Sequence, residues 1–201
     1  MSQTVTVYYA LSSPWTYLGW ARFRGLAERT GARVDHRPIK VARVFAASGG
    51  LPLAKRPKQR QAYRLQELRR WRDHLGMPLN LHPRHFPVDD QLAARMVIAC
   101  GQRGGDVSRL SEAIMRAVWV EERDIADPGT LEAIAADQGA GDDLLAAARA
   151  PEVEAHYEVN TQAAIEQGVF GVPTFVIGDQ LFWGQDRLDF VERALRESPA
   201  P

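Results

Sequence analysis

Four short segments near the two ends of the chain have the residue pattern of β-strands. Residues 4–9 read Thr-Val-Thr-Val-Tyr-Tyr, and residues 33–39 again contain β-branched side chains. Residues 174–177 and 181–183 form a close pair of apolar runs near the C-terminal end. Runs of β-branched and aromatic residues predict strands. Gly178 and Asp179 predict a turn between the last two strands.

The rest of the pattern is helical. Ser13 as an N-cap, with Pro14 at the first helical position, predicts a helix that ends at Gly31. Asp186 is expected to cap a final helix. Between residues 41 and 168 we predict no strand, and residues 41–57 should form a loop or a broken helix. Helices are predicted over 59–75, from Asp89 or Asp90 to about 100, and from Asp106 or Ser108 onward. Further helices are predicted over about 130–137, 142–149 and 151–168.

The order of these elements predicts one α/β domain with a large all-helical insertion. Strand–helix–strand comes first, a long helical stretch follows, and strand–strand–helix closes the chain. A strand, a helix and a strand in this order favour a parallel β-α-β unit. We place the α/β domain at residues 1–40 and 168–201 and the insertion at residues 41–167.

Composition excludes several kinds of chemistry. The 25 Lys and Arg residues balance 25 Asp and Glu residues, so net charge gives no attraction to nucleic acid or an anionic membrane. With no signal peptide and no run of 18 apolar residues, we expect a cytoplasmic location and no membrane partner. Cys100 is the one cysteine, which excludes a Cys-x-x-Cys redox pair. His82 and His85 lack a third ligand, so no metal site is predicted.

Two stretches carry candidate chemistry. Ser13 begins a predicted helix, and a helix N-terminus offers free N–H groups and a positive dipole end to an anion. A serine that only caps the helix is the simpler alternative. Val172 and Pro173 stand just before the strand at 174–177. An ordinary trans proline is the simpler interpretation there, whereas a cis peptide would leave the Val172 backbone available to an extended ligand.

Taken together, the two stretches match the layout of a thioredoxin-like fold. The helical insertion resembles the DsbA-like branch of that fold, in which the start of the first helix faces a cis-proline loop. Residues 13–16, Ser-Pro-Trp-Thr, lie where redox members carry Cys-x-x-Cys. The chain departs from the redox pattern at both sulfur positions.

The motifs narrow this resemblance to one family. Residues 13–18, Ser-Pro-Trp-Thr-Tyr-Leu, resemble the opening motif of the 2-hydroxychromene-2-carboxylate isomerase family. Residues 168–175, Gly-Val-Phe-Gly-Val-Pro-Thr-Phe, with residues 181–188, Leu-Phe-Trp-Gly-Gln-Asp-Arg-Leu, are similar to its C-terminal signature. The resemblance covers nearly the full chain. Kappa-class glutathione transferases are close relatives that share the fold and the serine.

The resemblance implies glutathione as cofactor. Ser13 would be the catalytic residue, hydrogen-bonding the glutathione thiolate, whose pKa a helix N-terminus lowers. The backbone at Val172 and Pro173 would pair with the cysteinyl part of glutathione, and Gln185 and Asp186 would hold its γ-glutamyl end. Asp186 serves equally well as a plain N-cap. Relatives also imply a homodimer.

The implied reaction interconverts 2-hydroxychromene-2-carboxylate and trans-o-hydroxybenzylidenepyruvate, in the breakdown of aromatic compounds. A small aromatic carboxylate calls for a nearby cation, and residues 55–72 are strongly basic. We expect Lys55, Lys58 and Arg60 to border the substrate together with Trp15, although a solvated helix face explains most of these charges as well.

Two other functions stay open on the sequence. One is a kappa-like glutathione transferase that acts on another electrophile, and the other is a non-catalytic thioredoxin-like binding module. The chain has Gly49-Gly50 where the family usually has Gly-Asn, which bears on the chromene substrate more than on glutathione.

Overall fold

Four short strands from the two ends of the chain form one mixed sheet. The computed structural model describes residues 3–141 and 143–197. The strand order is β2-β1-β3-β4, with β1 (Thr4–Tyr9), β2 (Arg33–Pro38), β3 (Thr174–Ile177) and β4 (Gln180–Trp183). The central strand β1 runs parallel to β2 and antiparallel to β3, and β4 is antiparallel to β3. The predicted strands and the 178–179 turn are therefore confirmed.

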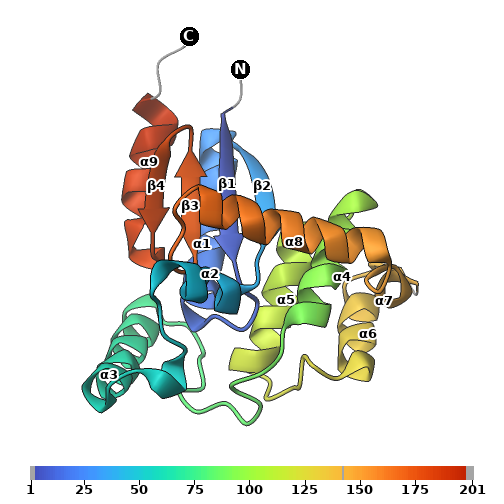
Figure 1. The fold of residues 1–201 in the computed structure, drawn as a ribbon, viewed down its shortest axis with the longest axis horizontal. Coiled ribbons are helices and arrows are strands. Elements are labelled where there is room, and N and C mark those ends of the chain that lie inside the picture. The colour runs from blue at the N-terminus through green and yellow to red at the C-terminus, as the bar shows by residue number, and fades with distance from the viewer. Residues whose placement is uncertain (1–2, 142, 198–201) are drawn as a thin grey trace.

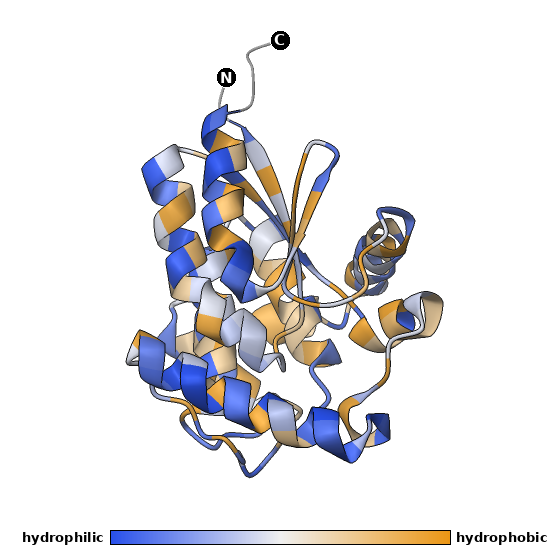
Figure 2. Ribbon diagram, turned by 90° about the vertical axis from the view of Figure 1, so that its left-hand side faces the viewer, coloured by the Kyte–Doolittle hydropathy of each residue, from blue (hydrophilic) through white to orange (hydrophobic). Residues whose placement is uncertain are grey.

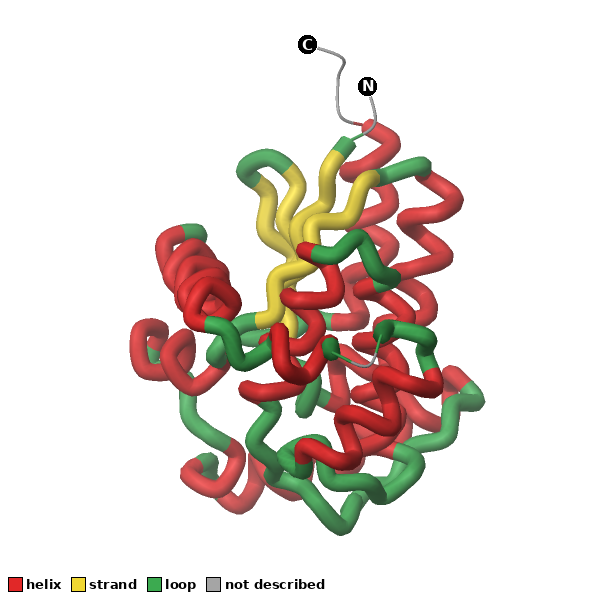
Figure 3. Tube along the Cα trace, turned by 90° about the vertical axis from the view of Figure 1, so that its right-hand side faces the viewer, coloured by secondary structure: helices red, strands yellow, loops and turns green. Residues whose placement is uncertain are grey.

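Helices cover both faces of this sheet. α1 (Pro14–Thr30) and α9 (Leu188–Glu197) lie on one face, while α8 (Pro151–Glu166) crosses the other (Figures 1 and 3). Val7 and Tyr9 point into the main hydrophobic cluster with Trp20 of α1. Tyr8 faces the opposite way, into a smaller cluster with Ala164 of α8. The alternation along β1 thus fills two cores, one on each face.

The remaining helices form the predicted helical stretch. Trp119 is fully buried in the cluster that also holds Trp20, so most of these helices share the core on the α1 face of the sheet, whereas Val44 lies in the smaller cluster on the opposite face. The predicted broken helix over 41–57 is a helix followed by a 3-10 turn, and residue 142, in the predicted 142–149 helix, lies outside the described residues. The bounds are α2 (Val41–Ser48), η1 (Leu53–Lys55), α3 (Lys58–Leu75), α4 (Gln91–Gln102), α5 (Val107–Trp119), α6 (Pro128–Asp137) and α7 (Leu144–Ala147).

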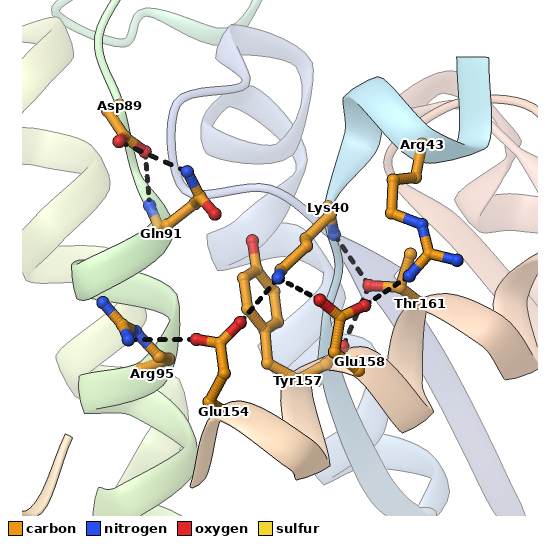
Figure 4. A network of polar contacts seen from close by, with 9 residues as sticks. All are labelled: Lys40, Arg43, Asp89, Gln91, Arg95, Glu154, Tyr157, Glu158 and Thr161. Carbon is orange, nitrogen blue, oxygen red and sulfur yellow. Dashed lines mark hydrogen bonds and ion pairs between the residues drawn. The ribbon is translucent and has the colours of Figure 1, made fainter. Parts of the chain in front are cut away.

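An ion-pair network fixes α8 against the start of α2 and against α4 (Figure 4). The Lys40 ammonium, whose side chain is only 16% exposed, contacts Glu158 and lies 2.6 Å from Glu154 Oε1. Arg95 of α4 pairs with the other oxygen of Glu154 at 2.9 Å, and Arg43 pairs with Glu158. Burial lowers the pKa of Lys40, but the hydrogen bonds to both glutamates outweigh it and raise that pKa. The lysine therefore stays charged, and the network as a whole joins α8 to α2 and α4.

The part of the chain that the structure describes has neither a cluster of metal ligands nor a membrane-spanning helix. It holds no group of three or more His, Cys, Asp or Glu side chains placed to bind a metal ion. Within residues 3–141 and 143–197, none of the helices combines the length and the hydrophobicity that crossing a bilayer requires.

Candidate active site

The register of the sheet brings the two candidate stretches to one edge. Tyr8 of β1 pairs with Thr174 of β3 in antiparallel register. β1 ends one residue later and leads to Ser13, while Pro173 comes directly before Thr174. Both loops therefore leave the sheet on the same side, where β1 ends in Figure 1. We call this the site edge. The Val172–Pro173 peptide there is cis.

Ser13 caps α1 and keeps a free donor. Its side chain is buried, and its Oγ accepts a hydrogen bond from the Thr16 N–H at 3.3 Å. The hydroxyl hydrogen of Ser13 finds no acceptor among the described residues, and the N–H of Trp15 also has no partner there. An O–H and an N–H donor thus remain at the positive end of the helix dipole, which favours an anion.

Val172 presents an unpaired piece of backbone at the same edge. Within the described chain, neither its N–H nor its C=O makes a hydrogen bond. Its neighbours are tied in place, since the Thr174 hydroxyl donates to the Gly171 carbonyl at 2.7 Å and the Gly184 N–H donates to the Pro173 carbonyl at 2.9 Å. A fixed donor–acceptor pair of this kind can bind an extended peptide as a further strand would.

The turn that holds Gln185 is locked onto α1. The Arg22 guanidinium donates to the Gln185 carbonyl at 2.9 Å and also contacts its side-chain oxygen. A Cβ on Gly19 would lie 2.8 Å from the Gln185 Cβ, so the glycine permits this close approach. Gln185 is 2% exposed. Its carbonyl and side-chain oxygen are therefore engaged within the fold.

The expected cap of the last helix is wrong. Asp186 lies inside a 3-10 turn, η2 (Gln185–Arg187), and α9 begins only at Leu188. The Asp186 side chain is exposed and pairs with Arg187 at 2.8 Å. Packing of the turn against Gly19 and Arg22 fixes this tighter conformation, so the α-helix starts later. Asp186 remains at the surface beside the site edge.

A buried carboxylate that the sequence did not single out holds the loop before Ser13. The N–H and the hydroxyl of Ser12 both donate to Asp90 Oδ2, at 2.9 Å and 2.8 Å. Burial raises the pKa of Asp90, against the opposing effect of these hydrogen bonds. Asp89, not Asp90, accepts the Gln91 N–H at the start of α4. Two adjacent acids before a helix predict a cap, and nothing in their spacing points to a partner 78 residues away.

The predicted cations make no hydrogen bond or ion pair with these groups in the described chain. Lys55 in η1 and Lys58 and Arg60 in α3 are exposed, and their side chains make no hydrogen bond or ion pair with any described residue. Trp15 is half-buried and packs against the main hydrophobic cluster. The fold thus gathers Ser13, Trp15 and the 172–173 loop at one edge, with the Gln185 turn beside them.

The chain is similar in sequence to a known domain family and to several characterised enzymes. Residues 4–196 match the family model of the DSBA-like thioredoxin domain. The chain is 31% identical to a 2-hydroxychromene-2-carboxylate isomerase of Sphingobium xenophagum, over 97% of this chain and 99% of that protein. It is 25% identical to human glutathione S-transferase kappa 1, over 98% of this chain and 92% of that protein.

The fold is similar to that of a solved 2-hydroxychromene-2-carboxylate isomerase. The TM-score is 0.76 at 28% identity, covering 96% of this chain and 94% of that one. A DsbA-like thioredoxin fold with a helical insertion, expected from the sequence, is thereby confirmed. The chain belongs to the DsbA-like thioredoxin domain family and groups there with the 2-hydroxychromene-2-carboxylate isomerases.

Proposed function

We propose that this protein is a glutathione-dependent isomerase that interconverts 2-hydroxychromene-2-carboxylate and trans-o-hydroxybenzylidenepyruvate. The observation that carries the proposal is the free Ser13 hydroxyl at the N-terminus of α1. In redox thioredoxins a cysteine occupies this place, whereas this chain offers only a donor. A site built to stabilise a thiolate that it does not itself contain requires a thiol ligand. The isomerase of 31% identity supports the reaction.

The groups at the site edge fit glutathione. A tripeptide needs a backbone donor and acceptor, which Val172 leaves unpaired. Its thiolate needs hydrogen-bond donors, which Ser13 and the Trp15 N–H supply. Thr16 adds a further polar group, because its hydroxyl oxygen is buried without any hydrogen-bond partner among the described residues. The relation to glutathione S-transferase kappa 1 supports the same cofactor.

The chain's own residues then stabilise the thiolate of glutathione. Ser13 donates a hydrogen bond to the sulfur, and the helix dipole adds a positive potential there. Each unit by which the thiol pKa falls corresponds to about 1.4 kcal/mol of thiolate stabilisation. Glutathione supplies a nucleophile that adds reversibly to a conjugated alkene, so that the former double bond can rotate. Ser13 cannot form a mixed disulfide, so the sulfur stays free for this chemistry.

A kappa-like transferase is the second candidate. The kappa-class relative at 25% identity favours it. The two activities differ in the fate of glutathione, which an isomerase returns free and a transferase leaves attached to the product. A cytoplasmic location and a homodimer remain predictions for either enzyme.

Reduced glutathione is expected to stabilise the wild-type protein against heat. A ligand at 100 times its dissociation constant stabilises a fold by about 2.7 kcal/mol, and each kcal/mol shifts Tm by roughly 2–4 °C at this size. Asp186→Ala should weaken the shift, because the exposed carboxylate is the proposed partner of the γ-glutamyl ammonium. Differential scanning fluorimetry at millimolar glutathione measures both. An unchanged wild-type Tm would remove glutathione from the account.

A further inference from the structure

Asp90 occupies the N-cap position of α4 without capping the helix. Its side chain makes no capping hydrogen bond, and Asp89 accepts the Gln91 N–H instead. The Asp90 carboxylate turns to Ser12, whose N–H and hydroxyl both donate to its Oδ2. The carboxylate is therefore committed to the loop before Ser13 and not to its own helix.

No cation of the described chain forms an ion pair with this carboxylate. Arg95, further along α4, is paired with Glu154 at 2.9 Å. α3, the largely hydrophilic helix across the lower part of Figure 2, is rich in arginine, but none of its cations pairs with Asp90. On the α8 side the neighbouring titratable group is Tyr157, which stays neutral because burial and the charge of Asp90 raise its pKa. The negative charge of Asp90 thus depends on hydrogen bonds and on the start of α4.

These surroundings make the carboxylate a better proton acceptor than an exposed one. Burial raises the pKa of Asp90, and the negative charge of Asp89 adds to this effect. The hydrogen bonds from Ser12 oppose it, because they favour the charged form. A carboxylate whose pKa is raised lies closer in basicity to a thiolate, which makes proton transfer from a thiol easier.

Ser12 connects Asp90 to the thiolate site proposed at Ser13. Its one hydroxyl proton is donated to Asp90 Oδ2 at 2.8 Å, and the lone pairs of its oxygen accept no hydrogen bond within the described chain. Ser12 is half-buried and so is partly open to the surface. The Ser13 N–H donates to the Ala10 carbonyl at 3.1 Å, which closes the turn that holds both serines. The Ser12 oxygen can therefore accept one proton while it gives up another.

We propose that Asp90 receives the thiol proton of glutathione through the hydroxyl of Ser12, a transfer that we call the Ser12–Asp90 relay. Ser12 Oγ accepts the proton from sulfur as its own hydroxyl proton passes to Asp90 Oδ2. The S–H bond breaks and its electron pair stays on sulfur, while the carboxylate becomes a neutral carboxylic acid. One negative charge thus moves from Asp90 to the sulfur beside Ser13, where the start of α1 stabilises it. This inference rests on the proposed function, because it requires glutathione at the site edge.

Isothermal titration calorimetry with reduced glutathione counts the protons that binding releases. The binding enthalpy is measured at neutral pH in phosphate and in Tris, which differ in ionisation enthalpy, and the ultraviolet absorbance of the complex measures the bound thiolate. Wild type should form the thiolate with almost no proton release, because Asp90 keeps the proton. In Asp90→Asn, each thiolate that forms should release about one proton to the buffer. Ser12→Ala leaves the carboxylate in place but breaks the relay, and should release the proton in the same way.

Asp89→Asn is the matched control, because it removes the neighbouring negative charge and leaves an oxygen to accept the Gln91 N–H. This variant should keep the proton balance of wild type. Ser12→Thr retains a hydroxyl and should restore what Ser12→Ala loses. If Asp90→Asn does not fold, the two Ser12 variants carry the test alone.

The outcomes separate the relay from the cofactor. One proton released per thiolate in wild type, or equal release by wild type and the relay variants, would overturn the relay and leave the glutathione site standing. Absence of both binding heat and thiolate absorbance in wild type would instead remove the proposed cofactor, and the relay with it.

Discussion

Ser13→Ala is expected to lower kcat by about 10²–10³-fold, the usual cost of removing one hydrogen bond from a developing or stabilised anion. Ser13 supplies an O–H donor at the N-terminus of α1. Steady-state rates at saturating glutathione measure the effect. The variant should also lose about 1 kcal/mol of stability, because Ser13 caps the helix.

Ser13→Gly separates the chemical role from the cap. Glycine is a good N-cap residue and costs only a few tenths of a kcal/mol there, yet it has no hydroxyl. We expect a Tm close to that of wild type together with the same loss of about 10²–10³-fold in kcat. Wild-type turnover in this variant would reduce Ser13 to a structural cap and favour a binding module.

Asp90→Ala is expected to lower Tm by roughly 4–8 °C, from a loss of about 2 kcal/mol. The N–H and hydroxyl of Ser12 would both lose their acceptor. Because Ser12 precedes Ser13, the loop before α1 should loosen and turnover should fall as well. Asp89→Ala is the matched control at the neighbouring position, since it removes only an exposed acceptor for Gln91. Equal Tm values for the two variants would contradict the role given to Asp90.

Asp90→Asn gives this prediction a pH dependence. Burial holds the folded pKa of Asp90 above its value in the unfolded chain. Protonated Asp90 thus stabilises the fold fully at low pH, and that contribution is lost as pH rises through the folded pKa. An amide oxygen still accepts from Ser12 but carries no charge. The stability of Asp90→Asn relative to wild type should therefore increase from acid to neutral pH. A difference that does not vary with pH would contradict this assignment.

The fold was predictable because its signals are local. The alternation along residues 4–9, Ser13 before Pro14, and the paired runs near the end each indicate one element, and the order of elements then selects the fold. The cap assigned to Asp186 failed because contacts with Gly19 and Arg22, far away in sequence, hold that segment in a 3-10 turn. Local rules contain no information about such contacts.

The candidate site was predictable only in part for the same reason. Ser13 and Val172 belong to motifs, and the β1–β3 register places their loops at one edge. The Ser12–Asp90 contact joins residues 78 positions apart. The sequence alone does not distinguish the basic residues of 51–66 from one another. Only burial on aromatic rings distinguishes Arg56 and Arg64 from their exposed neighbours.

The most direct test of the account follows the conversion of 2-hydroxychromene-2-carboxylate to trans-o-hydroxybenzylidenepyruvate with and without reduced glutathione. We predict that the wild-type protein accelerates the approach to equilibrium only when glutathione is present, and that all of the glutathione is recovered free. An equal rate without glutathione would contradict the proposed cofactor. No acceleration with glutathione would contradict the proposed reaction, and its consumption into product would assign the chain to the transferases.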